Sequence, residues 1–227
     1  MSDISIYLKP FSESVFNAAG FNNKRLGHQC SLYLENGSFP DYALADMAII
    51  GVPDMRGHGF DAFPMNGPDQ IRSYLYKLYS PLEEVRICDL GNVLPGKDPS
   101  DTRFALTEIC THLLEKGIIP IVLGGTQDLT FPLYNAYENL GQIINIASID
   151  PTIDLGGESD STDADSWVSK IILQQPSYLF NYTNIGYQRY RVDSEAVNLV
   201  KEMNFDAYRL GFVSENLNEI EPMIRNV

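Results

Sequence analysis

Residues 118–128 read IIPIVLGGTQD, and this stretch decides the fold. Its first six residues are apolar without interruption, which is typical of a strand buried on both faces of a parallel sheet. Gly124 and Gly125 then let the backbone turn sharply beside a ligand or another strand. The stretch therefore predicts a buried strand whose carboxyl end carries a loop in the position where α/β sheets bind ligands.

The same order of strand and helix continues on both sides of this stretch. Met47–Val52 is another apolar run, and Gly67-Pro68-Asp69 opens a helix, because proline is favoured at an early helical position. The expected apolar face of that helix consists of Ile71, Tyr74, Leu75 and Leu78. Further strands are expected at 85–90, 143–149, 182–187 and 207–210. Further helices are expected at 101–116, 128–140, 167–173 and 194–203. This alternation predicts an α/β fold of three layers, with a mainly parallel sheet between helices on both faces.

The first 45 residues lack this order. Tyr, Phe, Asn and Gly are scattered through them, and only Ile4–Leu8 alternates as a strand would. We expect residues 1–45 to form an irregular N-terminal extension lying across the main domain. Residues 46–227 are expected to form one α/β domain.

Composition and charge exclude several classes of protein. The chain has 227 residues, with 16 Lys and Arg against 30 Asp and Glu, so its net charge of −14 argues against binding nucleic acid or anionic membranes. No apolar run reaches the roughly 18 residues of a membrane span, and the N-terminus does not read as a signal peptide. The widely spaced Cys30, Cys88 and Cys110 predict reduced, mostly buried thiols. We expect a cytoplasmic protein.

Two strand-end loops carry the chemistry. Gly124–Asp128 follows one buried strand, and residues 150–154, which read DPTID, follow the next. Because ligands bind at the carboxyl ends of parallel strands, the two loops are expected to neighbour each other. Asp150 and Asp154 place two carboxylates on one turn, which is costly unless they meet a cation or hydrogen-bond donors.

Together these stretches resemble the ureohydrolase family, which comprises arginases, agmatinases and formiminoglutamases. Residues 51–53 (GVP) and 67–72 (GPDQIR) are similar to the family pattern G-V-P … G-P-x-x-I-R, and residues 89–93 (DLGNV) to D-L-G-D-V. Residues 120–125 (PIVLGG) resemble the strand that leads into the family's first metal loop. The resemblance runs from about Met47 to the C-terminus. It implies an arginase-like fold and manganese-dependent hydrolysis of C–N bonds in linear amidines.

The metal motifs depart from the family pattern. The family carries G-G-D-H-S at the first loop and D-A-H-x-D at the second, so its two histidines fall on Gln127 and Thr152. The resemblance leaves Asp150 and Asp154 as vestigial metal ligands. Neither a carboxamide nor a hydroxyl replaces a neutral imidazole for a metal such as Mn²⁺. We expect Mn²⁺ binding to be weak or absent, and repulsion between the two aspartates to raise one of their pKa values.

The resemblance also calls for a later D-x-D strand after residues 207–210, whereas the sequence stops at Val227. We therefore expect a domain that is incomplete at the C-terminus and whose last parallel strand has an open, apolar edge. Such an edge favours pairing with another chain. The expected partner is a second copy of the chain or an intact paralogue.

Structural roles compete with functional ones at several positions. Asp150 and Asp154 could serve only to hydrogen-bond their own loop. Asp128 could cap the following helix, and His58 could be a surface residue; both are also candidates for the loops that the family places near its substrate. The acidic residues at 156–166 lack the glycine and final glutamate of an EF-hand and are interpreted as a solvated loop.

Two main interpretations follow. In the favoured one, the chain keeps the ureohydrolase fold but has a degraded metal site, is catalytically weak or inactive, and acts as a binding or assembly partner. In the alternative, it is a metal-dependent C–N hydrolase of the formimidoylglutamase type, with a site completed by residues outside this chain. A pure interaction module is a third interpretation. The catalytic residues stay unassigned in all of them.

Overall fold

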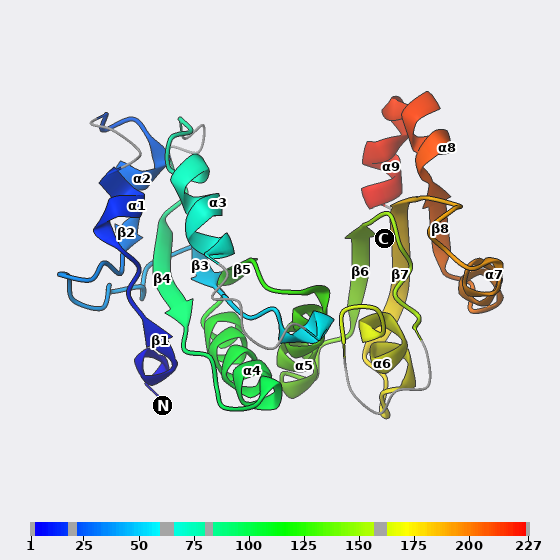
Figure 1. The fold of residues 1–227 in the computed structure, drawn as a ribbon, viewed down its shortest axis with the longest axis horizontal. Coiled ribbons are helices and arrows are strands. Elements are labelled where there is room, and N and C mark those ends of the chain that lie inside the picture. Colours follow the sequence, from blue (N-terminus) through cyan, green and yellow to red (C-terminus); the bar gives the residue numbers. More distant parts are fainter. Residues whose placement is uncertain (1–2, 18–21, 60–65, 80–83, 157–162, 226–227) are drawn as a thin grey trace. The chain divides into compact units, whose positions relative to one another are not determined.

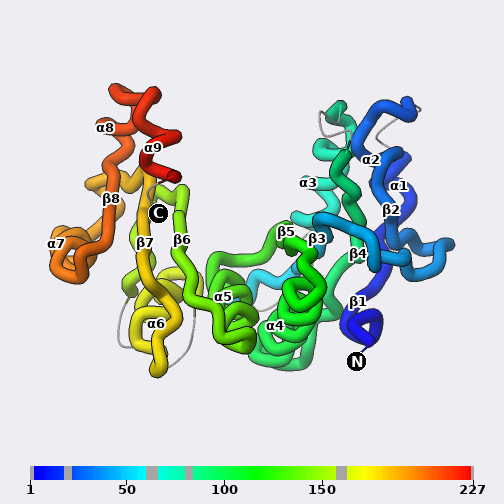
Figure 2. The backbone as a smooth tube through the Cα atoms, turned by 180° about the vertical axis from the view of Figure 1, so that it is seen from behind, coloured from blue at the N-terminus to red at the C-terminus, as the bar shows by residue number. Residues whose placement is uncertain are grey.

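The computed structural model describes residues 3–17, 22–59, 66–79, 84–156 and 163–225. The chain divides into two compact units, Met1–Ala136 and Tyr137–Val227. Each unit has its own sheet, and Figure 1 and Figure 2 trace the elements of each unit from opposite sides. Glu158 and Asp160 of the acidic loop lie outside the described residues.

The first unit is built on a sheet that has five strands among the described residues. Four of them follow the order β1 (Leu8–Lys9), β4 (Ile87–Val93), β3 (Met47–Gly51), β5 (Ile119–Leu123), and β2 (Ser31–Leu32) also pairs with β4. Only the β1–β4 pair is antiparallel. The helices are α1 (Glu13–Asn17), α2 (Leu26–Gln29), α3 (Gly67–Leu75), α4 (Pro99–Glu115) and the greater part of α5 (Thr130–Asn139). Short 3-10 helices are η1 (Ile4–Tyr7), η2 (Arg56–His58) and η3 (Gln127–Leu129).

Helices cover both faces of this first sheet. Ala48 and Ile50 of β3 belong to the same buried cluster as Leu106 of α4. Gly51 faces the other way, because a Cβ placed on it would lie 2.8 Å from the Cβ of Pro68 in α3. Since successive residues of a strand point to opposite faces, α3 and α4 lie on opposite sides of β3. The expected layered α/β arrangement is confirmed in this unit.

The second unit has a parallel sheet in the order β6 (Ile144–Ile149), β7 (Leu179–Tyr187), β8 (Asp206–Arg209). Its helices are α6 (Trp167–Leu173), α7 (Ser194–Glu202), α8 (Leu210–Glu215), η4 (Leu217–Glu219) and α9 (Ile220–Arg225). Trp167 of α6 packs against Tyr182, with 6.2 Å between ring centroids. Ile185 packs instead against Val213 of α8 and Met223 of α9. Tyr182 and Ile185 are three residues apart on β7, so α6 and the α8–α9 pair lie on opposite faces.

Two expectations about local structure are wrong. The helix α3 buries Pro68 and Arg72, whereas Ile71, Tyr74 and Leu78 of its expected apolar face are exposed. Residues 4–7 form the 3-10 helix η1 rather than a strand, because the Asp3 carboxylate accepts a hydrogen bond from the Ser5 amide and so caps that turn.

The N-terminal residues join the first unit through its sheet. β1 and β2, which both precede residue 46, pair with β4. The division between Ala136 and Tyr137 does not test the expected separation of residues 1–45 from 46–227, which stays a prediction. No helix in the described part of the chain is long and apolar enough to cross a membrane.

All three cysteines are free, and Cys88 and Cys110 are buried as expected. Burial raises the pKa of both thiols to about 12, so they are poor nucleophiles.

Among the described residues β8 is an edge strand, but its exposed residues are Asp206 and Arg209 rather than an apolar row. Large apolar side chains exposed on edge strands include Ile119 on β5, which is 54% exposed, and Ile149 on β6, which is 79% exposed.

Candidate functional site

The two strand-end loops lie in different units. Gly124–Asp128 follows β5 in the first unit, and Asp150–Asp154 follows β6 in the second. Each loop therefore has a geometry of its own, and the expectation that they neighbour each other stays a prediction.

The first loop turns as its paired glycines predict. Gly124 and Gly125 have φ angles of 78° and 79°, in the region that side chains other than glycine disfavour. A Cβ on Gly125 would also lie 2.0 Å from Leu129 Cδ1. Both backbone strain and lack of space thus require glycine here. The turn directs the following residues, Thr126 to Asp128, into η3.

Asp128 is buried and engaged by two partners. Its Oδ1 accepts a short hydrogen bond from the Thr126 hydroxyl, and its Oδ2 accepts one from Arg103 Nη1 at 3.2 Å. The residue lies inside η3 and is not the helix cap that the sequence suggested. Gln127, at the family's histidine position, is exposed. A carboxylate already neutralised by Arg103 is a poor cation ligand.

The loop after β3 runs beside Asp128. A Cβ placed on Gly57 would lie 2.1 Å from Asp128 Oδ1, so the backbone there approaches the carboxylate closely. His58 itself is exposed, in the last position of η2. The neighbouring Asp54 and Arg56 form a 2.6 Å ion pair, and Arg56 also donates to Thr102 of α4. Burial disfavours ionisation of Asp54, but the Arg56 hydrogen bonds outweigh it and keep the pKa of Asp54 below its usual range.

In the second loop, Thr152 bridges the two aspartates. The Thr152 amide donates to Asp150 Oδ1 at 2.7 Å, and the Thr152 hydroxyl lies 2.7 Å from the same oxygen and 2.9 Å from Asp154 Oδ1. Trp167 Nε1 donates to Asp154 Oδ2 at 2.6 Å. Asn184 Nδ2 donates to the Thr152 carbonyl at 2.8 Å and fixes the loop onto β7. Both aspartates are buried, so these bonds form away from bulk water.

The direction of the hydrogen bonds in this bridge depends on the protonation of Asp154. A hydroxyl carries a single hydrogen, so Thr152 cannot donate to two ionised carboxylates at once. When Asp154 is protonated, its Oδ1 can donate to Thr152 Oγ1 while Thr152 donates to Asp150 Oδ1. Burial raises the pKa of Asp154 to about 6, although hydrogen bonds from Trp167 and Thr152 oppose the rise, and the charge of Asp150 adds to it. The expected rise is therefore present, but burial contributes more to it than repulsion does.

The donors in these loops do not fit a two-metal site of the kind the family resemblance implies. Within each unit, the described residues contain no group of three or more His, Cys, Asp or Glu side chains that could hold a metal ion. In the second loop both Asp154 oxygens already accept hydrogen bonds, and residues 137–227 contain no histidine. In the first loop the carboxylate of Asp128 is paired with arginine. The carboxylates of Asp128, Asp150 and Asp154 all have protein hydrogen-bond or ion-pair partners.

A buried arginine holds α3 against β4 in the first unit, a role that was not expected from the sequence. Arg72 of α3 is fully buried and forms a bidentate pair with Asp89 of β4, at 2.8 and 2.9 Å. It also donates to Asn92 Oδ1 at 2.6 Å, and its guanidinium lies 4.5 Å from the centre of the Phe11 ring. Tyr76 donates a short hydrogen bond to Asp89. Arg72 is the last residue of the motif GPDQIR, which was noted in the sequence only because it matches a family pattern.

The sequence also matches a family model. The Arginase family model covers residues 45–225. This chain belongs to the arginase family. The match extends over most of the chain and confirms the ureohydrolase resemblance. Because it begins at residue 45, it includes both strand-end loops and leaves out β1 and β2.

Solved structures of other arginase-family members are similar in fold. A formiminoglutamase from Trypanosoma cruzi, solved with Mn²⁺, matches with a TM-score of 0.66 at 17% identity over 76% of this chain and 62% of that one. Formimidoylglutamase from Bacillus subtilis matches with a TM-score of 0.70 at 14% identity, over 88% of this chain and 65% of that one. Among curated proteins, the mitochondrial guanidino acid hydrolase of Mus musculus is 32% identical over 100 residues, which is 40% of this chain and 28% of the mouse protein. The chain thus spans less than two thirds of the length of each of these relatives.

Proposed function

We propose that this chain is an arginase-family protein that has lost the metal-dependent hydrolysis of its relatives and acts as a binding or assembly partner. The observation that carries the proposal is the bridge Asp150–Thr152–Asp154, closed by Trp167. A site for two metal ions needs carboxylate oxygens that point at the metals and imidazoles that complete their coordination. Here one hydroxyl and one indole N–H bind the carboxylate oxygens in place of a metal.

The first loop supports the same conclusion. Arg103 lies 3.2 Å from Asp128 and neutralises the carboxylate that follows Gln127. A cation beside Asp128 would face the guanidinium charge at short range, which weakens its binding. Gln127 adds at most a neutral carbonyl oxygen, a weaker ligand than imidazole for Mn²⁺. Both loops are therefore poor donors of metal ligands, for different reasons.

Calorimetric titration of the metal-stripped chain with Mn²⁺ tests this proposal. We expect no tight binding by the parent chain and a gain of affinity in the double variant Gln127→His, Thr152→His, because imidazoles return and the hydroxyl bridge is removed. A variant with two histidines at exposed sites elsewhere in the second unit, Gln142→His with Ser177→His, is the matched control. Tight Mn²⁺ binding by the parent, or its hydrolysis of arginine, agmatine or formiminoglutamate, would refute the proposal.

The competing function is a formimidoylglutamase-type hydrolase. The likeness to the Mn²⁺-containing formiminoglutamase of T. cruzi favours it at the level of fold. In that case residues outside this chain would have to complete the metal site. Metal analysis of the protein purified together with its partners separates the two functions, since bound manganese in stoichiometric amount supports the hydrolase and its absence supports the assembly role. The partner that we propose is a second copy of the chain or an intact paralogue.

A further inference from the structure

Positive charge in the second unit is concentrated around one cavity. Residues 137–227 contain six Lys and Arg against fourteen Asp and Glu. Three of those six basic residues, Arg189, Lys201 and Arg209, line a single cavity of about 590 Å³. No Asp or Glu is among the described residues that line it. In a strongly acidic unit this arrangement makes the cavity a local region of positive potential.

The three cations come from different elements. Arg189 follows the end of β7, Lys201 lies near the end of α7, and Arg209 is the last residue of β8. The cavity therefore lies where two parallel strands end, which is the side of an α/β sheet that binds ligands. Asn198 of α7 and Tyr187 of β7 add polar groups to its wall, while Val192 and Val197 provide an apolar surface.

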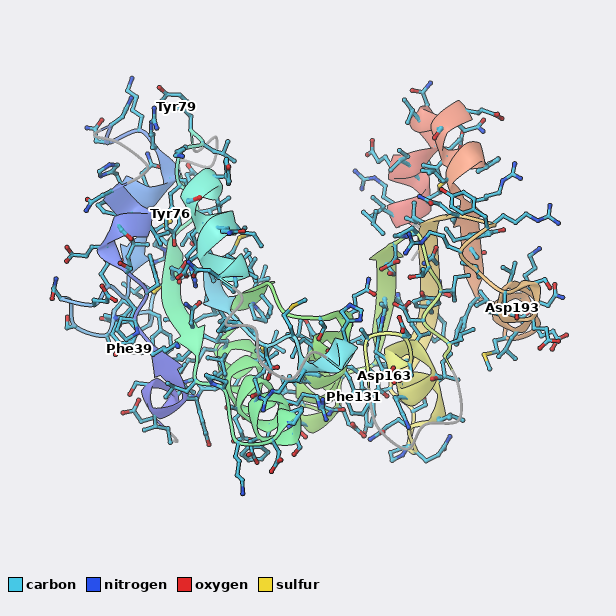
Figure 3. All side chains as sticks on the ribbon, in the orientation of Figure 1. Phe39, Tyr76, Tyr79, Phe131, Asp163 and Asp193 are labelled. Carbon is cyan, nitrogen blue, oxygen red and sulfur yellow. The ribbon has the colours of Figure 1, made fainter. Side chains whose placement is uncertain are left out.

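In the part of the chain that the structure describes, these cations have no carboxylate partner. Within the described residues, no Asp or Glu oxygen lies within 4.0 Å of Arg189, Lys201 or Arg209, whereas Arg225 nearby in sequence pairs with Glu221 at 2.8 Å. Asp193 borders the region but caps α7, its Oδ1 accepting from the Glu195 amide at 2.9 Å; Figure 3 labels it beside that helix. Three cations that line one cavity repel one another unless an anion lies between them.

A neighbouring cavity provides a contrast. It has a volume of about 720 Å³ and shares Val192 and Asn198 with the first. Its charged lining residues are Arg191 with Asp193, Glu195 and Glu202, so acids outnumber bases there. The absence of acids is thus a property of one cavity and not of the whole surface around α7.

We propose that the cavity of Arg189, Lys201 and Arg209 binds a small organic anion that carries two or more negative charges on phosphate or carboxylate groups. Guanidinium groups match both groups through paired hydrogen bonds. A volume of about 590 Å³ is in the range of small-molecule sites, and Val192 and Val197 suit the carbon skeleton of such a ligand. No residue that lines this cavity belongs to the Asp150–Asp154 loop, so the inference does not depend on the loss of hydrolysis.

The test uses pyrophosphate and citrate as probes, each titrated alone into the full chain by calorimetry at constant ionic strength. We expect the parent chain to bind at least one probe, with an affinity that falls as sodium chloride is raised. Binding of pyrophosphate alone identifies a phosphate ligand, and binding of citrate alone identifies a carboxylate ligand. Arg189→Gln and Arg209→Gln should each weaken binding by about tenfold, because each removes one forked contact to the anion.

The control is Arg225→Gln, which removes the same charge from the same unit outside the cavity. It should leave the affinity for either probe within about twofold of the parent value. All three arginines are exposed, so the variants are expected to fold, and circular dichroism checks this. The proposal is overturned if neither probe binds the parent chain, or if Arg225→Gln weakens binding as much as Arg189→Gln and Arg209→Gln do.

Discussion

Trp167 and Asp154 are joined by a hydrogen bond of 2.6 Å between the indole Nε1 and the carboxylate Oδ2. Both side chains are buried, and the bond ties the start of α6 to the loop that follows β6. Its donor carries no titratable proton, so the contact persists whether Asp154 is ionised or protonated. The bond therefore helps to hold the loop in place at any protonation state of Asp154.

Replacing Trp167 by Phe should destabilise the chain by about 1–3 kcal/mol, because it leaves a buried carboxylate oxygen without its donor. Urea unfolding followed by circular dichroism measures this. Trp167 is the single tryptophan of the chain, so fluorescence cannot follow the variant.

A double-mutant cycle with Asp154→Ala, which removes the acceptor, separates the hydrogen bond from the loss of ring volume. If the bond matters, the two substitutions together cost less than the sum of their separate effects. Strict additivity of the two would contradict the role assigned to this contact.

Stability in metal-free buffer should depend on pH through Asp154. Its pKa is raised to about 6 from an ordinary 3.8, so between these values the folded chain binds more protons than the unfolded chain. The free energy of unfolding contributed by this group is then largest below about pH 4 and falls as the pH rises to about 6, by about 2 kcal/mol. Comparing the parent with Asp154→Asn across pH 4 to 7 isolates this group. A parent curve parallel to that of the variant would contradict the assignment.

Arg72→Met should cost about 3–5 kcal/mol, because it leaves Asp89 as a buried, unpaired charge. The matched control is Arg86→Met, which breaks the exposed pair with Asp46 and should cost less than about 1 kcal/mol. Thermal unfolding of both variants checks the difference. Equal losses would mean that the burial of Arg72 does not determine its contribution.

The edge of β6 should promote self-association. β6 pairs only with β7 among the described residues, and its side chains at Asn145, Ala147 and Ile149 are exposed. A lysine at an edge strand opposes pairing with another chain, so Ala147→Lys should lower the association measured by sedimentation velocity. Leu173→Lys, at the exposed end of α6, adds the same charge away from the edge and should change association less. A parent chain that stays monomeric at all concentrations would exclude this route.

The sequence alone predicted the strands well, and for a clear reason. The apolar runs that contain β3 and β5 are nearly continuous, and such runs suit few structures other than buried parallel strands. The turn at Gly124 and Gly125 followed from the conformational needs of glycine. Periodicity was misleading at α3, where the apolar pattern pointed to Ile71 and Tyr74, because the partner of Arg72 lies seventeen residues away on β4.

The candidate site was predicted only in part. The motifs led to the expectation that Gln127 and Thr152 stand at the histidine positions of the family, but they did not reveal the groups that surround the carboxylates. Trp167 reaches Asp154 across thirteen residues, and Arg103 reaches Asp128 across twenty-five. Neither spacing follows a helical or strand period, so no local pattern marks these donors. The three cations of the anion cavity are likewise brought together only by the order of β7, α7 and β8.

The packing of Phe11 on Arg72 bears on how this protein can be dissected. The family model begins at residue 45, yet Phe11 covers the guanidinium, and Gly27 lies so close to Tyr76 that an added Cβ would be 2.7 Å from the tyrosine Cβ. A fragment shortened to the matched segment would lack Phe11 and Gly27. The buried ion pair of Arg72 and Asp89 would then be exposed to water. Such a fragment would be a poor substitute for the whole chain in binding assays, since its first helix would have lost the surface against which it folds.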